Sequence, residues 1–398
     1  MREMKDSGIA WIGAMPRAWK MNTIAQIFLQ VKCKNTGLQE KNLLSLSYGK
    51  VKRKSIDTVE GLLPESFDGY NIIEKDDIVL RLTDLQNDHT SLRVGLAEER
   101  GIITSAYLTI RNRSNFCPKY LYYYLHSFDI AKGFYGMGAG VRQGLNWDGV
   151  KWLKILAPSV PEQERIAAFL DAECAEIDAV LEKTRASIEE YKKLKQAVIT
   201  QAVTKGIRGD RPMKDSGIEW IGDIPVEWDY TKAKNCVNIQ NGSDPKTEGS
   251  IPVYGSGASS FKTCGEYKEG PSVLIGRKGA TLHIPHYVST KFWNVDTAFN
   301  VYAKPNFDLK FYFYCACSFD YRFYISQTTL PSMTQTAYEN MFLPLPSNDE
   351  QRAIASYLDN RCEEIDALIW KKQECLVEIE NYKKSLIYEY VTGKKEVV

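Results

Sequence analysis

The chain has 398 residues, with 51 Lys and Arg against 50 Asp and Glu, 44% hydrophobic residues and 25% charged residues. This composition is typical of a globular protein and excludes a disordered chain, a collagen and a continuous coiled coil. The length favours two or three domains. The longest apolar run, 311–319, is much shorter than the roughly 20 residues of a membrane-spanning helix. Nine Cys without a CxxC pair predict free thiols and a cytoplasmic location.

A tandem repeat determines the expected architecture. Residues 4–19, MKDSGIAWIGAMPRAW, return at 213–228 as MKDSGIEWIGDIPVEW, with 11 of 16 positions identical. Residues 162–204 match 350–392 at 17 of 43 positions. The segments between these two matches have diverged. A duplicated protein that keeps its connectors and rewrites two middle segments is interpreted as one scaffold that holds two different recognition domains.

The first middle segment, 20–161, mixes short strand-like runs with turn residues and has a net charge of +5. Strands are expected over 72–82 and 102–110, with counterparts in the second copy at 272–275 and 298–302. The aromatic runs 120–125 and 311–314 are predicted to be core elements rather than stacking platforms for bases. These patterns favour β-rich α+β domains.

The positive charge of this segment is concentrated in one cluster, which suits a loop that lies on a DNA backbone. Its members are Lys50, Lys52, Arg53 and Lys54. A solvated surface face would have the same composition. Arg81 follows the predicted strand residues Val79 and Leu80, and Ser105 is a polar position that precedes Tyr107, so these three are further candidates for DNA contacts. We also predict contacts from Arg142 and Gln143.

A long helix is predicted from Glu162 because an apolar stripe continues without Pro or Gly until Gly206. Ser159 and Glu162 have the spacing of a capping box, which Ser347 and Glu350 repeat. The stripe is Ile166, Leu170, Cys174, Ile177, Leu181, Ile188, Tyr191, Leu194 and Val198. Such a stripe must be buried, so we expect an antiparallel pair with the second copy; packing of each helix on its own globular segment is the alternative.

The second middle segment, 229–349, carries a net charge of only +1, and its candidate contacts surround one turn. Arg277 and Lys278 lie between two glycines directly after a predicted strand, where an Arg could bond a guanine edge in the major groove. Thr297 is the counterpart of Ser105, and a hydrogen bond at a strand end is an equally good explanation for both. Lys291 completes the predicted DNA contacts.

The sequence lacks the usual signatures of catalysis. It has neither a Pro-Pro dipeptide, as in amino-methyltransferase motifs, nor a GxxxxGK[ST] loop for ATP phosphates. Asp244 followed by Glu266 and Lys268 has the loose spacing of a nuclease motif that occurs commonly by chance. His283, His286 and Cys264 lack a fourth ligand for zinc. We therefore predict no catalytic residue and no metal site.

The repeated opening motif at Met4 and Met213, the Glu-Gln helix starts at Gln163 and Gln351, and the VLIGRKG turn at Val273 resemble the specificity subunits of type I restriction-modification systems. The resemblance covers nearly the whole chain. It implies two target-recognition domains, 1–161 and 207–349, each reading half of a split DNA site. It also implies two spacer helices, 162–206 and 350–398, that set the gap and dock two methyltransferase subunits. The expected fold is α+β with a pseudo-twofold internal repeat and two long antiparallel helices.

In that family the partner subunits carry the chemistry. The resemblance implies S-adenosylmethionine, ATP and Mg only for the modification and motor-nuclease partners, and no cofactor for this chain. The alternative from the residues is a duplicated adaptor that binds proteins rather than DNA. The target sequence, the gap length and the presence of a restriction subunit do not follow from the sequence.

Overall fold

The computed structural model describes residues 2–55, 66–87, 90, 92–137, 144–321, 324–325 and 331–397. The chain divides into two compact units, Met1–Lys183 with Cys375–Val398 and Thr184–Glu374. Each unit therefore contains one globular domain with one end of each long helix. The helices are α4 (Val160–Lys205) and α8 (Asn348–Val391). They begin two residues before the predicted segments, and α8 ends before the tail that was included in the segment 350–398.

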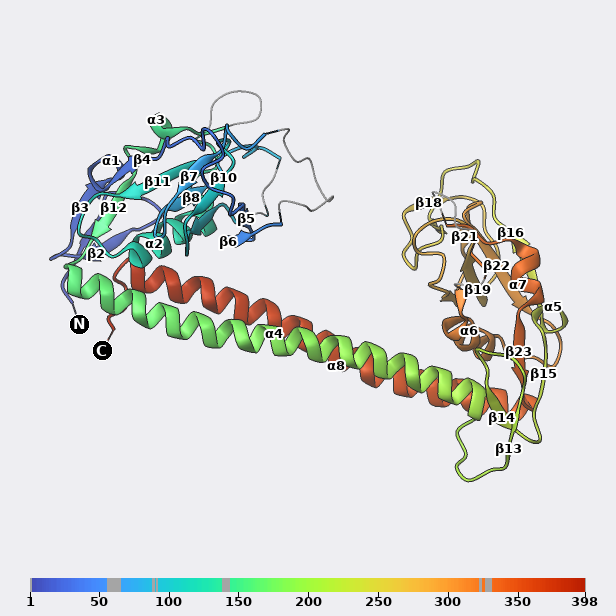
Figure 1. Cartoon of the computed structure of the whole chain (residues 1–398). Helices are drawn as coiled ribbons and strands as arrows, with labels where there is room; N and C mark the ends of the chain where they lie inside the picture. Colours follow the sequence, from blue (N-terminus) through green and yellow to red (C-terminus); the bar gives the residue numbers. More distant parts are fainter. Residues whose placement is uncertain are drawn as a thin grey trace. The chain divides into compact units, whose positions relative to one another are not determined.

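The globular part of the first unit is built on the four-stranded antiparallel sheet β4-β11-β8-β9 (Figure 1). Smaller pairs are β1-β2, β3-β12, β5-β6 and β10-β7. The bounds are β1 Met4–Asp6, β2 Ala14–Pro16, β3 Lys20–Thr23, α1 Ile24–Ile27, β4 Phe28–Gln30, β5 Leu44–Ser47, β6 Lys50–Arg53, β7 Asn71–Ile73, β8 Ile78–Leu80, β9 Val94–Leu96, β10 Gly101–Ile103, β11 Leu108–Asn112, α2 Pro118–Ile130, α3 Trp147–Val150 and β12 Lys154–Ala157.

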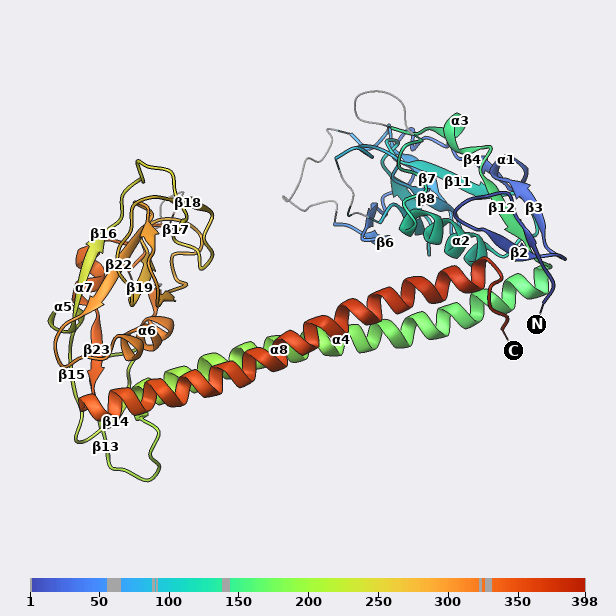
Figure 2. The same ribbon diagram turned by 180° about the vertical axis from the view of Figure 1, so that it is seen from behind.

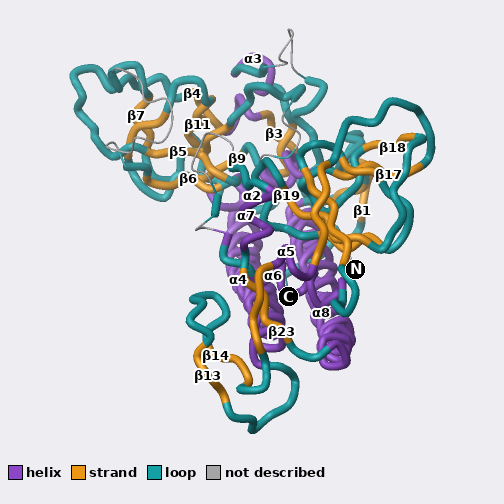
Figure 3. Tube along the Cα trace, turned by 90° about the vertical axis from the view of Figure 1, so that its right-hand side faces the viewer, coloured by secondary structure: helices purple, strands orange, loops and turns teal. Residues whose placement is uncertain are grey.

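The second unit repeats this plan with the sheet β16-β22-β19-β20 and the pairs β13-β14 and β15-β23 (Figure 1), and the pair β13-β14 is also seen in Figure 3. It differs by a three-stranded sheet, β18-β17-β21, where the first unit has its two extra pairs. The bounds are β13 Met213–Asp215, β14 Asp223–Pro225, β15 Asp229–Lys232, α5 Ala233–Cys236, β16 Val237–Asn241, β17 Ile251–Tyr254, β18 Lys262–Cys264, β19 Ser272–Gly276, β20 His286–Val288, β21 Trp293–Asn294, β22 Ala298–Ala303, α6 Leu309–Ser318, α7 Gln335–Asn340 and β23 Phe342–Leu345.

Two predicted strands are each interrupted by a turn. The segment 72–82 forms β7 and β8, separated by a turn in which Asp76 has φ 70°. The segment 102–110 forms β10 and β11, separated at 104–107. The strands expected at 272–275 and 298–302 are confirmed as β19 and β22. The single-strand predictions were wrong because continuous apolar character does not show where the chain reverses.

The aromatic runs form the core, as predicted. Tyr120 and Leu121 in α2 and Phe311 and Tyr312 in α6 are fully buried. The α2 run packs in one cluster with Ile166 and Leu170 of α4, and the α6 run packs in the corresponding cluster of the second unit. These helices therefore fasten the sheets to the long helices rather than offering rings to a ligand.

In each unit the two long helices lie antiparallel and side by side (Figure 2). In the first unit Asp178 of α4 pairs with Lys383 of α8 at 2.6 Å, and in the second Lys195 of α4 pairs with Asp366 of α8 at 2.6 Å. The apolar stripe of α4 packs both on α8 and on the globular cores. Packing of helix on helix and packing of each helix on a globular segment, which were predicted as alternatives, therefore both occur. Leu194 departs from the predicted stripe because it is 46% exposed.

Candidate nucleic-acid interface

The two copies of the opening motif hold the start of each long helix by the same contacts. Trp19 donates its Nε1 proton to Glu162, as Trp228 does to Glu350, over 3.2 and 2.9 Å. Arg2 and Arg211 pair with the same two glutamates. The predicted capping box is therefore incomplete, because these carboxylates bond to the motif instead of reaching back to the helix cap. We call each set of Arg, Trp and Glu a clasp.

A second repeated contact fixes α2 and α6 on the long helices. Lys119 and Tyr123 of α2 bond to the carboxylate of Asp171. Lys310 and Tyr314 of α6 bond to Asp359 in the same way. The carboxylate therefore sits between a cation and a hydroxyl in both units, and the two globular domains are mounted on their helices alike.

The predicted basic cluster lies mostly on the exposed strand β6, which pairs with β5. The connecting residues Tyr48 and Gly49 both have positive φ, which is the geometry of a tight two-residue hairpin turn. Lys50 lies 3.9 Å from Asp178 and Lys52 extends into solvent, whereas the guanidinium of Arg53 is held by both oxygens of Glu99. The cluster thus offers lysines to a phosphate backbone, but Arg53 already has a carboxylate partner.

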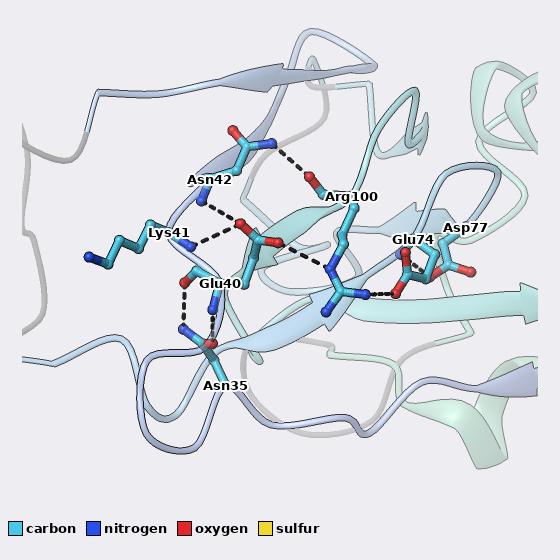
Figure 4. Close-up of polar contacts among 7 residues, drawn as sticks. All are labelled: Asn35, Glu40, Lys41, Asn42, Glu74, Asp77 and Arg100. Atoms are coloured by element: carbon cyan, nitrogen blue, oxygen red, sulfur yellow. Dashed lines mark hydrogen bonds and ion pairs between the residues drawn. The ribbon is translucent and has the colours of Figure 1, made fainter.

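Sequence analysis did not single out the polar network beside this hairpin (Figure 4). Arg100 donates to the carboxylates of Glu40 and Glu74, and Asn42 donates to the carbonyl of Arg100 over 2.7 Å. The backbone N–H of Asn42 also bonds to Glu40 and lowers the pKa of that carboxyl. Buried Asn35 exchanges two hydrogen bonds with the backbone of Glu40. Long-range pairing of this kind leaves no local signal in the sequence.

The other candidates of the first domain lie outside the hairpin β5–β6, although Tyr107 packs against a cluster that includes apolar residues of β5. Arg81 follows β8 and its backbone N–H bonds to Arg93. Ser105 is exposed in the turn before β11, and Tyr107 packs partly against a core cluster with Leu44 and Val79. Arg142 and Gln143 lie outside the described residues.

Three candidates of the second domain lie together at one end of the sheet. The backbone N–H groups of Arg277 and Lys278 both donate to the carbonyl of Thr297, over 2.8 and 3.3 Å. The guanidinium of Arg277 lies over the ring of Phe299 at 5.9 Å, and the ammonium of Lys278 is 4.0 Å from Asp296. β19 ends at Gly276, so both cations leave the sheet edge on the following turn.

Lys291 lies elsewhere, between β20 and β21. Its ammonium is 3.9 Å from the centre of the Tyr267 ring and 3.5 Å from Glu269. Its partners precede β19 in the chain, so Lys291 lies near the N-terminal end of β19, whereas Arg277 and Lys278 lie beyond its C-terminal end.

The turn of Arg277 and Lys278 borders a hollow of about 280 Å³. Its remaining lining consists of Asn241, Phe299, Ser332, Met333, Thr334 and Gln335. Asn241 is the last residue of β16 and Gln335 the first of α7. Sequence reasoning missed both amides because single Asn and Gln residues at element ends have no distinguishing pattern.

The residues weighed for metal and nuclease chemistry have other roles. The thiol of Cys264 donates to the carbonyl of Glu266, and His286 packs against Tyr254 at 5.3 Å. The Glu266 carboxylate accepts from the hydroxyl of Thr247 and from nearby backbone N–H groups, which lowers its pKa to about 2. Within the described part of the chain, no group of three His, Cys, Asp or Glu side chains has an arrangement suited to a metal ion. No described helix is both long and apolar enough to cross a membrane.

Comparison with known proteins shows which family the chain resembles. Residues 225–376 match the type I restriction modification DNA specificity domain. A putative type I restriction enzyme MjaX specificity subunit from Methanocaldococcus jannaschii is 23% identical, over 97% of this chain and 96% of its own length. These two matches support the interpretation of the chain as a type I restriction-modification specificity subunit.

A second curated relative resembles the chain in sequence, and two solved structures resemble it in fold. The MjaVIII specificity subunit of the same archaeon is 25% identical over 62% of this chain and 63% of its own. A chain from a solved type I R-M system has a TM-score of 0.73, with 17% identity, and covers 96% of this chain and 99% of its own. The HsdS subunit from Thermoanaerobacter tengcongensis has a TM-score of 0.52, with 16% identity over 96% and 98% of the two chains. The specificity-subunit interpretation is therefore favoured over the protein-binding adaptor.

Proposed function

We propose that this specificity subunit reads a bipartite DNA target, with one half-site for each globular domain. The observation that carries the proposal is the combination of repeated mounting with unlike reading surfaces. The clasps and the Asp171 and Asp359 contacts are the same in both units. The first domain has a lysine-bearing hairpin, whereas the second has a cationic turn beside a hollow. A common mount with different contact residues suits two different sequences.

The long helices are the proposed spacer between the half-sites and the docking surface for two methyltransferase subunits. Several large apolar side chains of the helices are exposed, which supports a protein partner. Trp370 is 57% exposed, Val377 58% and Tyr382 55%. Burial of such anchors would supply the favourable energy of association.

In this proposal the chain itself performs no catalysis and binds no cofactor. Adenine methylation with S-adenosylmethionine, and any ATP- and Mg-dependent cleavage by a motor-nuclease subunit, belong to the partners. A cytoplasmic location is part of the same proposal, and the free state of all nine cysteines suits a reducing compartment.

The test is replacement of residues 20–158 by the corresponding domain of another specificity subunit, followed by mapping of methylated adenines in a host genome. One half of the methylated site should change while the other half and the gap stay the same. Replacement of 229–346 is the matched control and should change only the opposite half. A change in both halves from either replacement would show that the two domains do not read DNA independently.

A further inference from the structure

The hollow at the end of the second domain's sheet is lined by amide and guanidinium groups to which the proposed function assigns no role. Asn241, Phe299 and Ile275 stand in register across the three strands β16, β22 and β19. Arg277 lies two residues beyond Ile275, and its guanidinium is placed over the Phe299 ring. The amide of Asn241 and the guanidinium of Arg277 therefore border the same opening from two strands.

The orientation of the Asn241 amide follows from its neighbours. Gln335 donates its Nε2 protons to the carbonyl of Ile239 over 3.1 Å and to the carboxylate of Glu339 over 2.8 Å. Both partners are acceptors, so the Gln335 nitrogen must face them and its oxygen must face Asn241. Asn241 then donates one Nδ2 proton to that oxygen over 3.4 Å. This leaves the Oδ1 acceptor and the second Nδ2 proton of an exposed side chain for a ligand.

Arg277 is likewise held in place while most of its hydrogen-bond donors stay available for a ligand. Its backbone is fixed on both sides, because its N–H donates to Thr297 and its carbonyl accepts from Met333 over 2.9 Å. Its guanidinium makes one long bond, 3.4 Å, to the carbonyl of Asp296. Among the described residues no carboxylate lies within ion-pair distance of it, in contrast to Arg53, Arg100 and Arg111. The remaining donors of its planar fork face an opening rather than a partner.

We propose that this hollow is a base-reading site in which Asn241 recognises an adenine and Arg277 a guanine, through their major-groove edges. An amide that presents one acceptor and one donor matches adenine N6 and N7, and a guanidinium matches the O6 and N7 acceptors of guanine. Gln335 is a positioning residue that holds the Asn241 amide in the reading orientation. This inference rests on the proposed function and adds the base types and residues to it.

The corresponding place in the first domain carries different chemistry. By the repeat and the strand register, Lys32 stands where Asn241 does, Leu108 stands for Phe299, and Trp147 at the start of α3 stands for Gln335. No amide pair can form from these residues. The adenine-reading arrangement is therefore expected in only one half-site.

The experiment selects duplexes from a randomised library with the full-length protein and sequences the bound DNA. The wild-type protein should enrich a bipartite motif with a guanine and an adenine in one half. Asn241→Asp replaces the amide donor by a second acceptor and should move the preference at one position from adenine to cytosine, whose N4 amino group donates. Arg277→Ala should lower discrimination at the guanine roughly 5- to 150-fold.

Three further variants separate reading from folding. Gln335→Met keeps the side-chain length but removes the acceptor for the Asn241 amide. It should relax the base preference at the position of the DNA motif that Asn241 reads, while the preferences at all other positions stay unchanged. A purely structural role for Gln335 would weaken binding at every position. Lys32→Ala, the matched control, should leave this half of the motif intact. Asn241→Ser is the second variant at the reading position and should relax it without a new preference.

Two failures can be distinguished. A wild-type protein that enriches no sequence would overturn the DNA-reading function, and the base assignment with it. A wild-type protein that enriches a bipartite motif, together with Asn241→Asp that enriches the same motif, would overturn only the base-reading site. Equal weakening of all sequences by Asn241→Asp would also overturn it, because that is the behaviour of a phosphate contact.

Discussion

At the residue scale, His126 is a buried polar group that the two repeats do not share. It lies in α2 with only 8% exposure, stacks on Tyr122 at 5.4 Å and has no hydrogen-bond partner at Nδ1 among the described residues. The groups that face it are Lys383 of α8 and Asp178 of α4, and the Asp178 carboxylate is also 3.9 Å from Lys50. Burial, with a smaller contribution from Lys383, lowers the pKa of His126 to about 4. The equivalent position in the second unit is Cys317.

This difference predicts an acid sensitivity of the first unit. The unfolded chain binds a proton near pH 6.5 while the folded His126 stays neutral until about pH 4, so stability is lost as the pH falls between these values. The expected loss is about 2.5 kcal/mol between roughly pH 7.5 and pH 4.5. His126→Cys, the residue of the other copy, should lower stability at neutral pH but remove this component.

The measurement is urea unfolding across that pH range, monitored with a probe placed within the first unit. Cys317→Ser in the second unit is the control and should leave the pH slope unchanged. Equal slopes for wild type and His126→Cys would show that His126 is not the group responsible.

At the element scale, the hairpin β5–β6 predicts a division of labour among its basic residues. Lys52 is exposed and no described carboxylate pairs with it, whereas Arg53 is held by Glu99. Lys52→Ala should therefore weaken binding to all duplexes alike and reduce the slope of log affinity against log salt by about 1. Arg53→Ala should change this slope less, because its charge is already partly neutralised. A larger slope change for Arg53→Ala than for Lys52→Ala would contradict the role of the hairpin.

The long helices allow a test of spacing. The ion pairs of Asp178 with Lys383 and of Lys195 with Asp366 bracket 178–195 of α4 and 366–383 of α8. Four residues inserted into both brackets lengthen each helix by about 6 Å, nearly two base-pair steps. Methylation mapping should then show the same half-sites with a wider gap. Undiminished methylation at the original gap would mean that the helices do not set the distance.

Sequence periodicity predicted the long helices well because a recurring apolar stripe is a local signal. Ile166, Ile177 and Ile188 of the predicted stripe are all buried as expected. It failed at Leu194, which is exposed, because the buried face of α4 near its end is formed by Ile199 and Val203 instead. The reading surfaces were predicted only in part. The Gly-bounded turn indicated Arg277 as a candidate. Asn241 and Gln335 are 94 residues apart in the chain and come into contact only on folding, so no local sequence pattern predicts their contact.

At the scale of the whole molecule, the two chain ends belong to the same unit and meet at the first clasp. Arg2 pairs with Glu396 at 3.0 Å, and Lys394 donates to the carbonyl of Ile12 over 2.7 Å. Residues near the two termini therefore lie close together. The corresponding place in the second unit is the continuous and exposed connector around Arg208, which precedes the Arg211 contact with Glu350.

We therefore predict that a circular permutant folds and keeps its DNA specificity. Val398 is joined to Met1 through a short linker, and the chain is opened between Arg208 and Gly209, so that Arg211 stays with its clasp. Exposed connectors tolerate such cuts. The check is the selected DNA motif together with the thermal midpoint. A cut within α2 is the control and should abolish folding, and an insoluble Arg208 permutant would contradict the prediction.

The matched ion pairs between the helices also bear on the history of the gene. Asp178 precedes Lys195 by the same 17 positions that separate Asp366 from Lys383, and each Asp pairs with the Lys of the other copy. Two identical half-length polypeptides in an antiparallel helix pair would form this bridge twice, as the symmetric contact of a homodimer. The present chain is what fusion of two such ancestral genes would produce. Such a fusion would leave each half free to change its exposed surface while the helix contacts between the two halves stay the same.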